Sequence, residues 1–307
     1  MSKVYFASAR VKKWKYDESM PGKLERLLRE IGLSKYFEKD EWVAVKTHFG
    51  SQGAHRIVRP VFLRKVVEAL KATEAKPFVT DTVRIKGLDY LEVANQNGIN
   101  HLSVDAPVVI ADGLYGNDNI MVKAGDILGE IAVASLIYDV PAMVVCSHIK
   151  GHINAGYAGA IKNIAMGAVS GSHRHCGWKC GRGAMHTIGE GKLIWDEEKC
   201  AFCYQCEEVC PLDCISFKDD RFDYYDERCW RCGRCTRVCP EGVLVIPGDD
   251  VLLKEKPLPS SLAEDEDIKQ GDDILASLHK KPYLLQVEEA ERLGLGSRKY
   301  ELIEIQK

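Results

Sequence analysis

The sequence predicts an α/β domain with a largely parallel sheet, plus an inserted, cysteine-rich α+β module. Two observations support this fold class. Apolar segments of strand length alternate with segments whose apolar residues recur at helical spacing, which is the pattern of strand–helix–strand units. Two copies of one cysteine motif then interrupt the alternation. Strand-like and helix-like sequence patterns resume near the C-terminus.

The predicted elements follow from short local patterns. Strands are expected at Lys3–Ala7, Trp42–Lys46, Phe78–Thr80, Val108–Ile110 and Ala142–Cys146. A helix is expected where Leu24, Leu27, Leu28 and Ile31 fall at helical spacing, and Gly32 is a suitable residue to end it. Pro60 opens a second helix, because its fixed φ angle suits the first turn.

Composition and charge argue against several classes of protein. With 46% hydrophobic residues, 28% charged residues and a net charge of −3, the chain has the make-up of a globular protein without the basic surface of a nucleic-acid binder. No signal peptide is expected, and Asp139 and Pro141 interrupt the most apolar stretch, residues 131–145. We therefore expect a cytoplasmic protein without membrane or nucleic-acid partners, in which the twelve cysteines bind metal rather than form disulfides.

Eight of these cysteines stand in two copies of the motif CxxCxxCxxxCP. The first copy begins at Cys200, and each of its cysteines recurs 29 positions later in the copy that begins at Cys229. This is the bacterial-type iron–sulfur motif, in which the fourth cysteine of each copy ligates the other cluster. We therefore assign one 4Fe-4S cluster to Cys200, Cys203, Cys206 and Cys239, and a second to Cys229, Cys232, Cys235 and Cys210.

The repeat predicts a two-cluster, ferredoxin-like α+β module duplicated about a pseudo-twofold axis. A pair of zinc sites is the alternative, but the third cysteine of each motif is in excess for tetrahedral zinc. The expected domains are 1–190 for the α/β domain, 191–247 for the ferredoxin-like module, and 248–307 for an acidic connector and a C-terminal segment that returns to the α/β domain.

Four cysteines lie outside the two motifs. Cys214 has Val243 at its equivalent position in the second copy, which favours a small buried apolar role, and Cys146 ends an apolar run. Cys176 and Cys180 stand among histidines, namely His173, His175 and His186. A third metal site, a redox-active thiol pair and plain loop cysteines all remain open for Cys176 and Cys180.

Polar side chains follow the predicted strands of the α/β domain. Because ligands of parallel sheets bind beyond the carboxyl ends of the strands, these positions mark a candidate site. We expect catalytic roles for Lys46, His48, His148, Lys150 and His152, and cofactor-binding roles for Lys162, Asn163, Asp81 and Asp112.

Several lysines and histidines around one crevice favour an anionic ligand, and such crowding lowers their pKa values, so that one of them can act as acid or base. The alternative is that they are solvated loop residues. No glycine-rich phosphate loop follows these strands, which disfavours nucleotide binding of that type.

Over nearly its whole length the chain resembles the iron–sulfur proteins grouped as domain-of-unknown-function family 362. The sequence segments that carry the resemblance are VKTHFG, RPVFLRKVVEAL, PFVTDT, PVVIADGL, SHIKGHINAGYAGAIKNIAMG, the two cysteine motifs and GLGSRKYEL. The resemblance implies an α/β domain with a ferredoxin insertion, found in anaerobes, and leaves the reaction open.

The leading functional hypothesis is a ferredoxin-linked oxidoreductase. Its clusters would exchange electrons with an anionic substrate or organic cofactor, for which a flavin or flavin-derived cofactor, including its maturation, is the first candidate. A redox partner protein, either a ferredoxin or another oxidoreductase, and a homo-oligomeric state are also expected. The main alternative is a non-catalytic electron carrier or assembly factor that docks on a partner enzyme. A third, metal-assisted hydrolysis with Asp81 or Asp112, leaves the clusters unexplained.

Overall fold

A computed structural model describes most of the chain. The described residues are 2–84, 87–124, 130–152, 156–175, 181–182, 192–210, 213–219, 221–226, 229, 233–246, 285–292, 294 and 297–305. The strands are β1 Ser2–Phe6, β2 Trp42–Lys46, β3 Lys76–Asp81, β4 Val108–Ile110, β5 Asn119–Lys123, β6 Glu130–Ala134, β7 Ala142–Val145, β8 Lys150–His152, β9 Gly156–Ala158, β10 Ile194–Trp195, β11 Ile215–Lys218, β12 Arg221–Tyr224, β13 Leu244–Val245 and β14 Tyr300–Glu304.

The α-helices are α1 Met20–Ile31, α2 Pro60–Lys71, α3 Gly87–Gln96, α4 His101–Val104, α6 Ser135–Asp139, α7 Ala160–Gly167, α9 Gln205–Glu208, α10 Arg234–Val238 and α12 Leu285–Arg292. Short 3-10 helices lie at Tyr16–Glu18, Leu33–Lys35 and Glu197–Lys199. None of the helices in the described ranges is long and apolar enough to cross a membrane.

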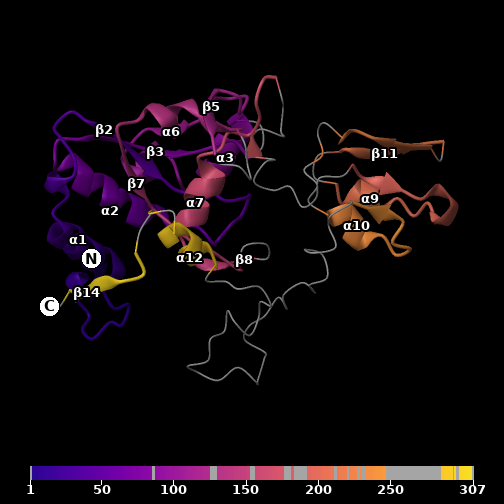
Figure 1. The fold of residues 1–307 in the computed structure, drawn as a ribbon. Helices are drawn as coiled ribbons and strands as arrows, with labels where there is room; N and C mark the ends of the chain where they lie inside the picture. The colour runs from indigo at the N-terminus through magenta and orange to yellow at the C-terminus, as the bar shows by residue number, and fades with distance from the viewer. Residues whose placement is uncertain are drawn as a thin grey trace.

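A four-stranded parallel sheet forms the centre of the α/β part, with strand order β4-β3-β2-β7. Figure 1 labels β2, β3 and β7 of this sheet. Val43, Ala44 and Val45 of β2 are completely buried, as expected for a strand covered on both faces. Because all four strands are parallel, their carboxyl ends meet at one edge. The four central strands are those that the sequence pattern predicts.

Hydrophobic residues pack on both faces of this sheet. Val43 and Val45 belong to a large cluster that includes residues of α1, α2 and α3, whereas Met143 of β7 packs in a second cluster with residues of α6 and α7. Side chains of a strand alternate between faces, so Lys46 lies on the face opposite Val43 and Val45. The face that carries Lys46 is also where α7 contacts β7.

The end of the first long helix and the start of the second are those that the sequence predicts. In α1 the Ser19 side chain accepts a hydrogen bond from the Gly22 N–H at 3.2 Å, and the helix ends at Gly32 with φ 69°. Pro60 starts α2, which buries Leu63, Val66, Val67 and Leu70 at helical spacing. Local capping chemistry therefore sets these boundaries.

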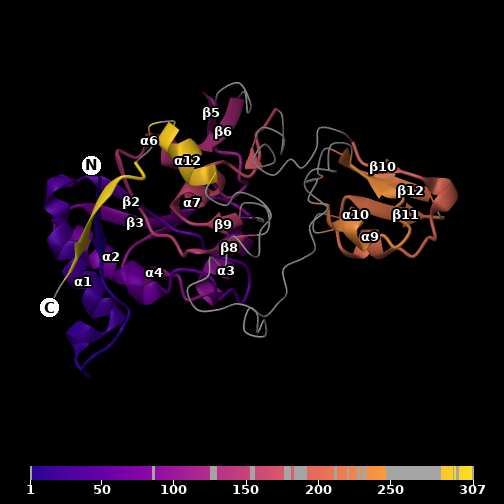
Figure 2. The same ribbon diagram turned by 60° about the horizontal axis from the view of Figure 1, so that its bottom comes forward.

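The N-terminal strand does not join the central sheet. Instead β1 pairs in parallel with β14, from Ser2↔Tyr300 to Phe6↔Glu304, as a separate two-stranded sheet (Figure 2). After the cysteine module the chain thus returns to its own first strand. The pairing partner was not predictable locally, because a strand's sequence pattern carries no information about which strand lies next to it.

Residues 192–246 form a lobe of their own in both ribbon views (Figures 1 and 2). Strand β10 pairs with β13, and β12 pairs with β11, both antiparallel. The pairs Trp195↔Leu244 and Tyr224↔Ile215 are related by the same 29-residue offset as the cysteines. Helices α9 and α10 also begin 29 residues apart, so the sequence repeat is a repeat of structure.

Candidate functional site

The two cysteine loops have the same backbone turn. Tyr204 and Gly233, which are equivalent in the repeat, precede α9 and α10 with φ angles of 57° and 66°. A left-handed residue at this point turns the chain sharply into the helix, and only the second copy uses glycine for it. In the first copy, Cys200 and Cys203 before the helix and Cys206 inside it line a common space.

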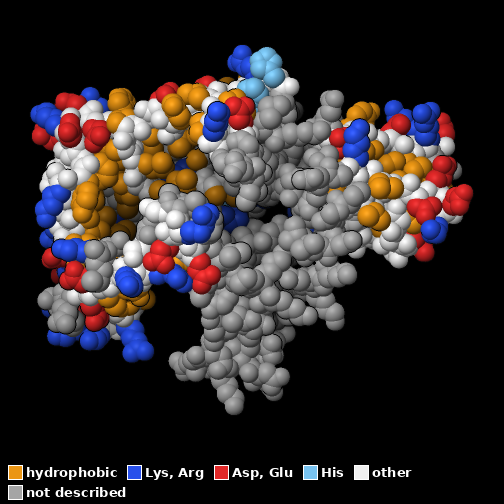
Figure 3. All heavy atoms as spheres, in the orientation of Figure 1, with side chains coloured by type: hydrophobic (Ala, Val, Ile, Leu, Met, Phe, Trp, Pro, Cys, Tyr) orange, Lys and Arg blue, Asp and Glu red, His pale blue; other side chains and the backbone are white. Residues whose placement is uncertain are grey.

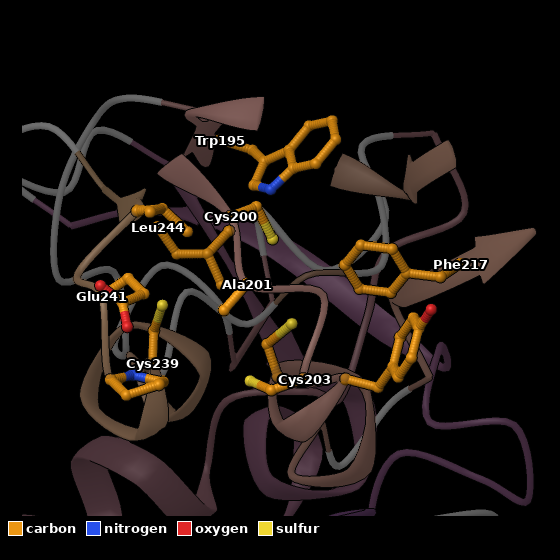
Figure 4. A pocket seen from close by; sticks show the side chains of 12 residues that line it. Trp195, Cys200, Ala201, Cys203, Phe217, Cys239, Glu241 and Leu244 are labelled. Atoms are coloured by element: carbon orange, nitrogen blue, oxygen red, sulfur yellow. The ribbon is translucent and has the colours of Figure 1, made fainter. Parts of the chain in front are cut away.

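One cavity in the lobe is lined by four thiols that come from both motifs. They are Cys200, Cys203 and Cys206 of the first copy and Cys239 of the second, the set assigned to the first cluster from spacing (Figure 4). Cys206 is buried and Cys203 is exposed. The remaining lining is mostly apolar and includes Trp195, Phe217 and Leu244.

The four cysteines of this cavity are the donor set that a 4Fe-4S cluster takes. Among the described residues, no three Cys, His, Asp or Glu side chains converge closely enough to hold one metal ion, whereas zinc requires sulfurs about 2.3 Å from a single centre. The Phe202 N–H lies 3.4 Å from Cys200 Sγ, which is the kind of backbone donor that stabilises cluster sulfur. Four thiols around a space, rather than a point, suit a 4Fe-4S cluster.

The second set is described in part. Cys210, Cys229 and Cys235 lie in the described ranges, whereas Cys232 does not. The Cys214 N–H donates to Cys210 Sγ at 3.2 Å, and the Cys214 side chain, 1% exposed, hydrogen-bonds with Cys210 and Cys229. Cys214 is therefore buried as expected, but it lies against two assigned ligands rather than in a purely apolar environment.

At the carboxyl end of the parallel sheet, Lys46 and Asp81 form a buried ion pair. Lys46 Nζ donates to Asp81 Oδ1 at 2.8 Å, to Asn163 Oδ1 at 2.8 Å and to the Thr47 carbonyl at 3.0 Å. Three acceptors match the three protons of an ammonium group, so Lys46 is charged and has no donor left for a ligand. A Cβ at position 167 would overlap Lys46 Nζ, which is why α7 has Gly167 there.

Asp81 is the hub of this network. Its Oδ2 atom accepts from the Tyr90 hydroxyl at 2.6 Å and the Phe49 N–H at 3.2 Å, and it lies 3.2 Å from His48 Nδ1. Burial favours a raised pKa for Asp81, but the Lys46 ammonium and the His48 hydrogen bond outweigh it and hold that pKa well below its usual range. Asp81 is therefore ionised.

His48 differs from Lys46 because its side chain is 43% exposed. Loss of hydration lowers the pKa of His48, and the hydrogen bond with Asp81 only partly opposes this. Asp81 engages Nδ1, which leaves Nε2 as the ring nitrogen for a ligand. Of the predicted acid or base residues, His48 has the carboxylate-oriented geometry that such a role requires.

A group of cations lies around Lys162 of α7. Partial burial and the charges of Arg182, Lys150 and Arg84 together lower the pKa of Lys162 to about 8, although Asp81 opposes the shift. Arg182 is 7% exposed; its Nη2 donates to Thr82 Oγ1 at 2.7 Å, and its Nε has no hydrogen-bond partner among the residues that the structure describes. Lys162, Arg182, Lys150 and Arg84 therefore face two carboxyl groups here, Asp81, which is already paired with Lys46, and Asp112, on which the charge of Arg182 also acts.

The other predicted residues lie in different surroundings. Asp112 is buried and accepts from the Val83 N–H at 2.7 Å and the Gly171 N–H at 2.8 Å, so it fixes a loop apart from the Lys46 network. Lys150 Nζ donates to the Arg56 carbonyl. Loss of hydration and nearby Lys150 lower the pKa of exposed His148. His152 ends β8, and its side chain is outside the described set.

Asn163, for which a cofactor-binding role is expected from the sequence, joins two strands in the structure. Its Oδ1 accepts from Lys46, while its Nδ2 donates to the Cys146 carbonyl at 3.0 Å and to Ser147 Oγ at 2.9 Å. The ends of β2 and β7 are thereby bound to α7. Cys146 itself packs against the main hydrophobic cluster, as its apolar context predicts.

Sequence reasoning missed two members of the site, Tyr90 and Arg182. Tyr90 lies within a helical apolar pattern, where an aromatic residue is expected to be core, and it is indeed 1% exposed. Arg182 stands between two glycines, where no periodicity marks it. Cys176, Cys180 and His186 lie outside the described residues, and the rings of His173 and His175 are 5.5 Å apart.

On the face shown in Figure 3, basic and acidic side chains are interspersed rather than gathered in a patch of one sign. A parallel α/β sheet combined with duplicated cysteine loops that enclose a thiol-lined cavity defines an iron–sulfur protein. Its class is that of redox proteins with an electron-transfer role.

Comparisons with known families agree with this class. A family model described as domain of unknown function (DUF362) matches residues 43–224, more than half of the 307-residue chain. A model described as 4Fe-4S binding domain matches residues 223–245, which contain the second cysteine motif. The chain belongs to the DUF362 family and binds 4Fe-4S through a ferredoxin-type motif. No curated protein and no solved structure matches it.

Proposed function

We propose that this protein is an oxidoreductase that carries two 4Fe-4S clusters and exchanges electrons with an anionic substrate or organic cofactor bound at the carboxyl end of the parallel sheet. The first cluster would be held by Cys200, Cys203, Cys206 and Cys239, and the second by Cys229, Cys232, Cys235 and Cys210. The clusters supply one-electron transfer when bound. The reaction of the ligand would depend on residues of the α/β part.

The observation that carries the proposal is the unbalanced positive charge around Lys162. Arg182 is nine-tenths buried, and its Nε–H has no acceptor within the described part of the protein. Leaving a buried guanidinium donor unpaired is unfavourable, and so is placing Arg182 close enough to Lys162 to lower its pKa. A bound anion would remove both penalties, because it supplies acceptors and negative charge together.

His48 supports the choice of a redox reaction at this site. Reduction of an organic molecule usually takes up protons as well as electrons, and a half-exposed histidine oriented by Asp81 is suited to transfer them. Lys46 would act as a positioning residue, because it is buried and holds Asp81 and Asn163 in place. The proposed roles of His148, Lys150 and His152 are to line the approach to this site.

The ligand of this site must be anionic and must exchange electrons with the clusters. A flavin or flavin-derived cofactor meets both requirements, since it carries a phosphate and accepts single electrons. A separate redox protein would supply or remove the electrons. The exposed position of Cys203 supports such an exchange, because it brings an assigned cluster ligand to the surface of the lobe.

The test begins with protein purified without oxygen, in which iron and acid-labile sulfide are counted and small molecules are released by acid and identified by mass spectrometry. Binding of inorganic phosphate is then measured by calorimetry for the natural protein, for Lys162→Gln and for Lys13→Gln, which removes an exposed lysine elsewhere. Lys162→Gln should bind phosphate about tenfold more weakly, the loss expected for one charge-assisted hydrogen bond of roughly 1.5 kcal/mol.

Lys13→Gln should behave like the natural protein, and all three proteins should keep about eight irons, the content of two 4Fe-4S clusters. Equal phosphate binding by the two variants, with no released molecule, would reject the proposed anion site. It would favour the alternative of an electron carrier that docks on a partner enzyme. Zinc in place of iron would remove the redox function altogether.

A further inference from the structure

An aromatic residue stands five positions before each cysteine motif. These residues are Trp195 and Tyr224, and the 29-residue repeat makes them equivalent. Each lies on a short strand that pairs with the strand following the other motif, Trp195 with Leu244 and Tyr224 with Ile215. The two positions therefore have the same relation to the two clusters, but their polar groups differ.

The indole ring of Trp195 is held in one orientation. It stacks on Phe222 with ring centroids 4.8 Å apart and planes 23° apart, and it makes edge contacts of 6.2 Å with both Phe202 and Phe217. Packing on several sides fixes where the ring nitrogen points. Trp195 also lines the cavity that contains the four thiols.

The ring nitrogen of Trp195 is buried and has no hydrogen-bond partner among the described residues. An indole N–H can only donate, so it needs an acceptor, and buried donors in folded proteins almost always have one. Figure 4 shows the ring nitrogen on the side of Trp195 that faces Cys200 and the cavity. The unpaired donor is thus directed at the cluster position.

Few other acceptors are available around this cavity. Apart from the cysteines and the backbone, its polar lining groups are the Tyr204 hydroxyl and the Glu241 carboxylate. Tyr204 is 41% exposed and packs its ring against Phe217, and Glu241 is exposed. Sulfur is therefore the acceptor that the cavity presents to Trp195.

We propose that the Trp195 indole N–H donates a hydrogen bond to a sulfur of the cluster held by Cys200, Cys203, Cys206 and Cys239, and that this bond raises the reduction potential of that cluster. A donor stabilises the extra negative charge that the cluster gains on reduction, so it favours the reduced form. The proposal rests on the proposed function only in requiring a cluster at this position.

The equivalent residue serves the second cluster differently. The Tyr224 hydroxyl donates to Asp226 Oδ1 at 3.0 Å and also has a hydrogen-bonding contact with Cys229. Its proton is engaged within the protein, whereas the Trp195 proton is left for the cluster. The two clusters are therefore inequivalent in a way that the identical cysteine spacing does not reveal.

The experiment compares Trp195→Phe with Tyr224→Phe, after iron and sulfide counts establish that both clusters are present. Phenylalanine keeps the aromatic packing and removes only the polar group. In a redox titration followed by electron paramagnetic resonance, Trp195→Phe should shift one of the two midpoint potentials to a more negative value and leave the other in place. Tyr224→Phe should not shift that same midpoint. Unchanged midpoints in Trp195→Phe would overturn the proposal.

A second measurement does not depend on the stability of Trp195→Phe. Protein labelled with ¹⁵N in the tryptophan indole is reduced, and its nitrogen hyperfine couplings to the clusters are recorded by pulsed paramagnetic resonance. A coupling should be present in the natural protein and in Trp230→Phe, which removes the tryptophan next to Cys229 in sequence. No coupling in the natural protein, or its loss in Trp230→Phe, would reject Trp195 as the donor, while missing iron would reject the proposed function instead.

Discussion

Two regions of the molecule bring their functional side chains together in different ways. They are the Lys46–Asp81 network at the carboxyl end of the parallel sheet and the cysteine-containing lobe of residues 192–246. Lys46 and Asn163 are 117 residues apart in sequence, and the packing of a large hydrophobic core brings them together with Asp81. The cysteines of the lobe span only residues 200–239, and the small core around them includes Cys206 and Cys235 themselves. Protein contacts alone complete the arrangement around Lys46, whereas the core of the lobe includes cysteines that we propose as cluster ligands.

Removal of iron should have the largest effect, and it should destabilise the lobe while leaving the parallel sheet folded. A core this small is insufficient without its metal, and the energy of metal binding becomes folding energy. After anaerobic chelation, hydrogen exchange measured by mass spectrometry should show lost protection in 193–246 and retained protection in β2 and β3. Equal loss in both regions would mean that the sheet also depends on the clusters, and equal retention would mean that the lobe folds without iron.

Breaking the buried ion pair should have a smaller but still severe effect on the sheet. Asp81→Asn leaves Lys46 charged, 0% exposed and without a carboxylate, and it should lower the free energy of unfolding by about 3–5 kcal/mol. Urea unfolding followed by circular dichroism would measure the change. Asp105→Asn is the matched control, because its 2.9 Å pair with Lys71 lies at the surface and should contribute little. A similar stability for both variants would contradict the assigned burial of the Lys46–Asp81 pair.

The pH dependence of anion binding is the mildest effect. The pKa of Lys162 is about 8, so its charged fraction falls roughly tenfold between pH 7 and pH 9. Only the protonated form attracts an anion, and affinity is therefore present below this pKa and lost as pH rises through it. Sulfate is a suitable probe, because its own charge is constant over this range. Its affinity should fall by up to about tenfold, and Lys162→Arg should move the fall to higher pH. A flat profile in the natural protein would exclude Lys162 from the site.

Local sequence patterns were sufficient to predict the features that depend only on residues close together in the chain. Gly32 ends α1, Pro60 opens α2, and the continuous apolar run of β2 marks a strand buried on both faces. The cysteine spacing likewise identified four thiols that share a cavity although they come from two motifs. In each case the necessary chemistry lies within a few residues or within an exact repeat.

Other features depended on packing between distant segments. The sequence placed polar residues at the ends of the strands, but only the tertiary structure showed that Lys46 is buried with all its donors engaged, that His48 is half exposed, and that Asp112 belongs to a different network. Burial and hydrogen-bond partners decide whether a lysine or histidine is structural or reactive, and neither is encoded in its neighbours along the chain.

By itself, then, the sequence determined the class of fold, the family and the four thiols that line one cavity, because periodicity and spacing are local quantities. Only the tertiary structure decided that β1 pairs with β14 outside the central sheet, that Arg182 enters the Lys162 site, and that Trp195 points its N–H at the thiol cavity. These three outcomes share one physical reason. Each depends on which surface a side chain or strand meets after the chain has folded, and identical local patterns can meet different surfaces.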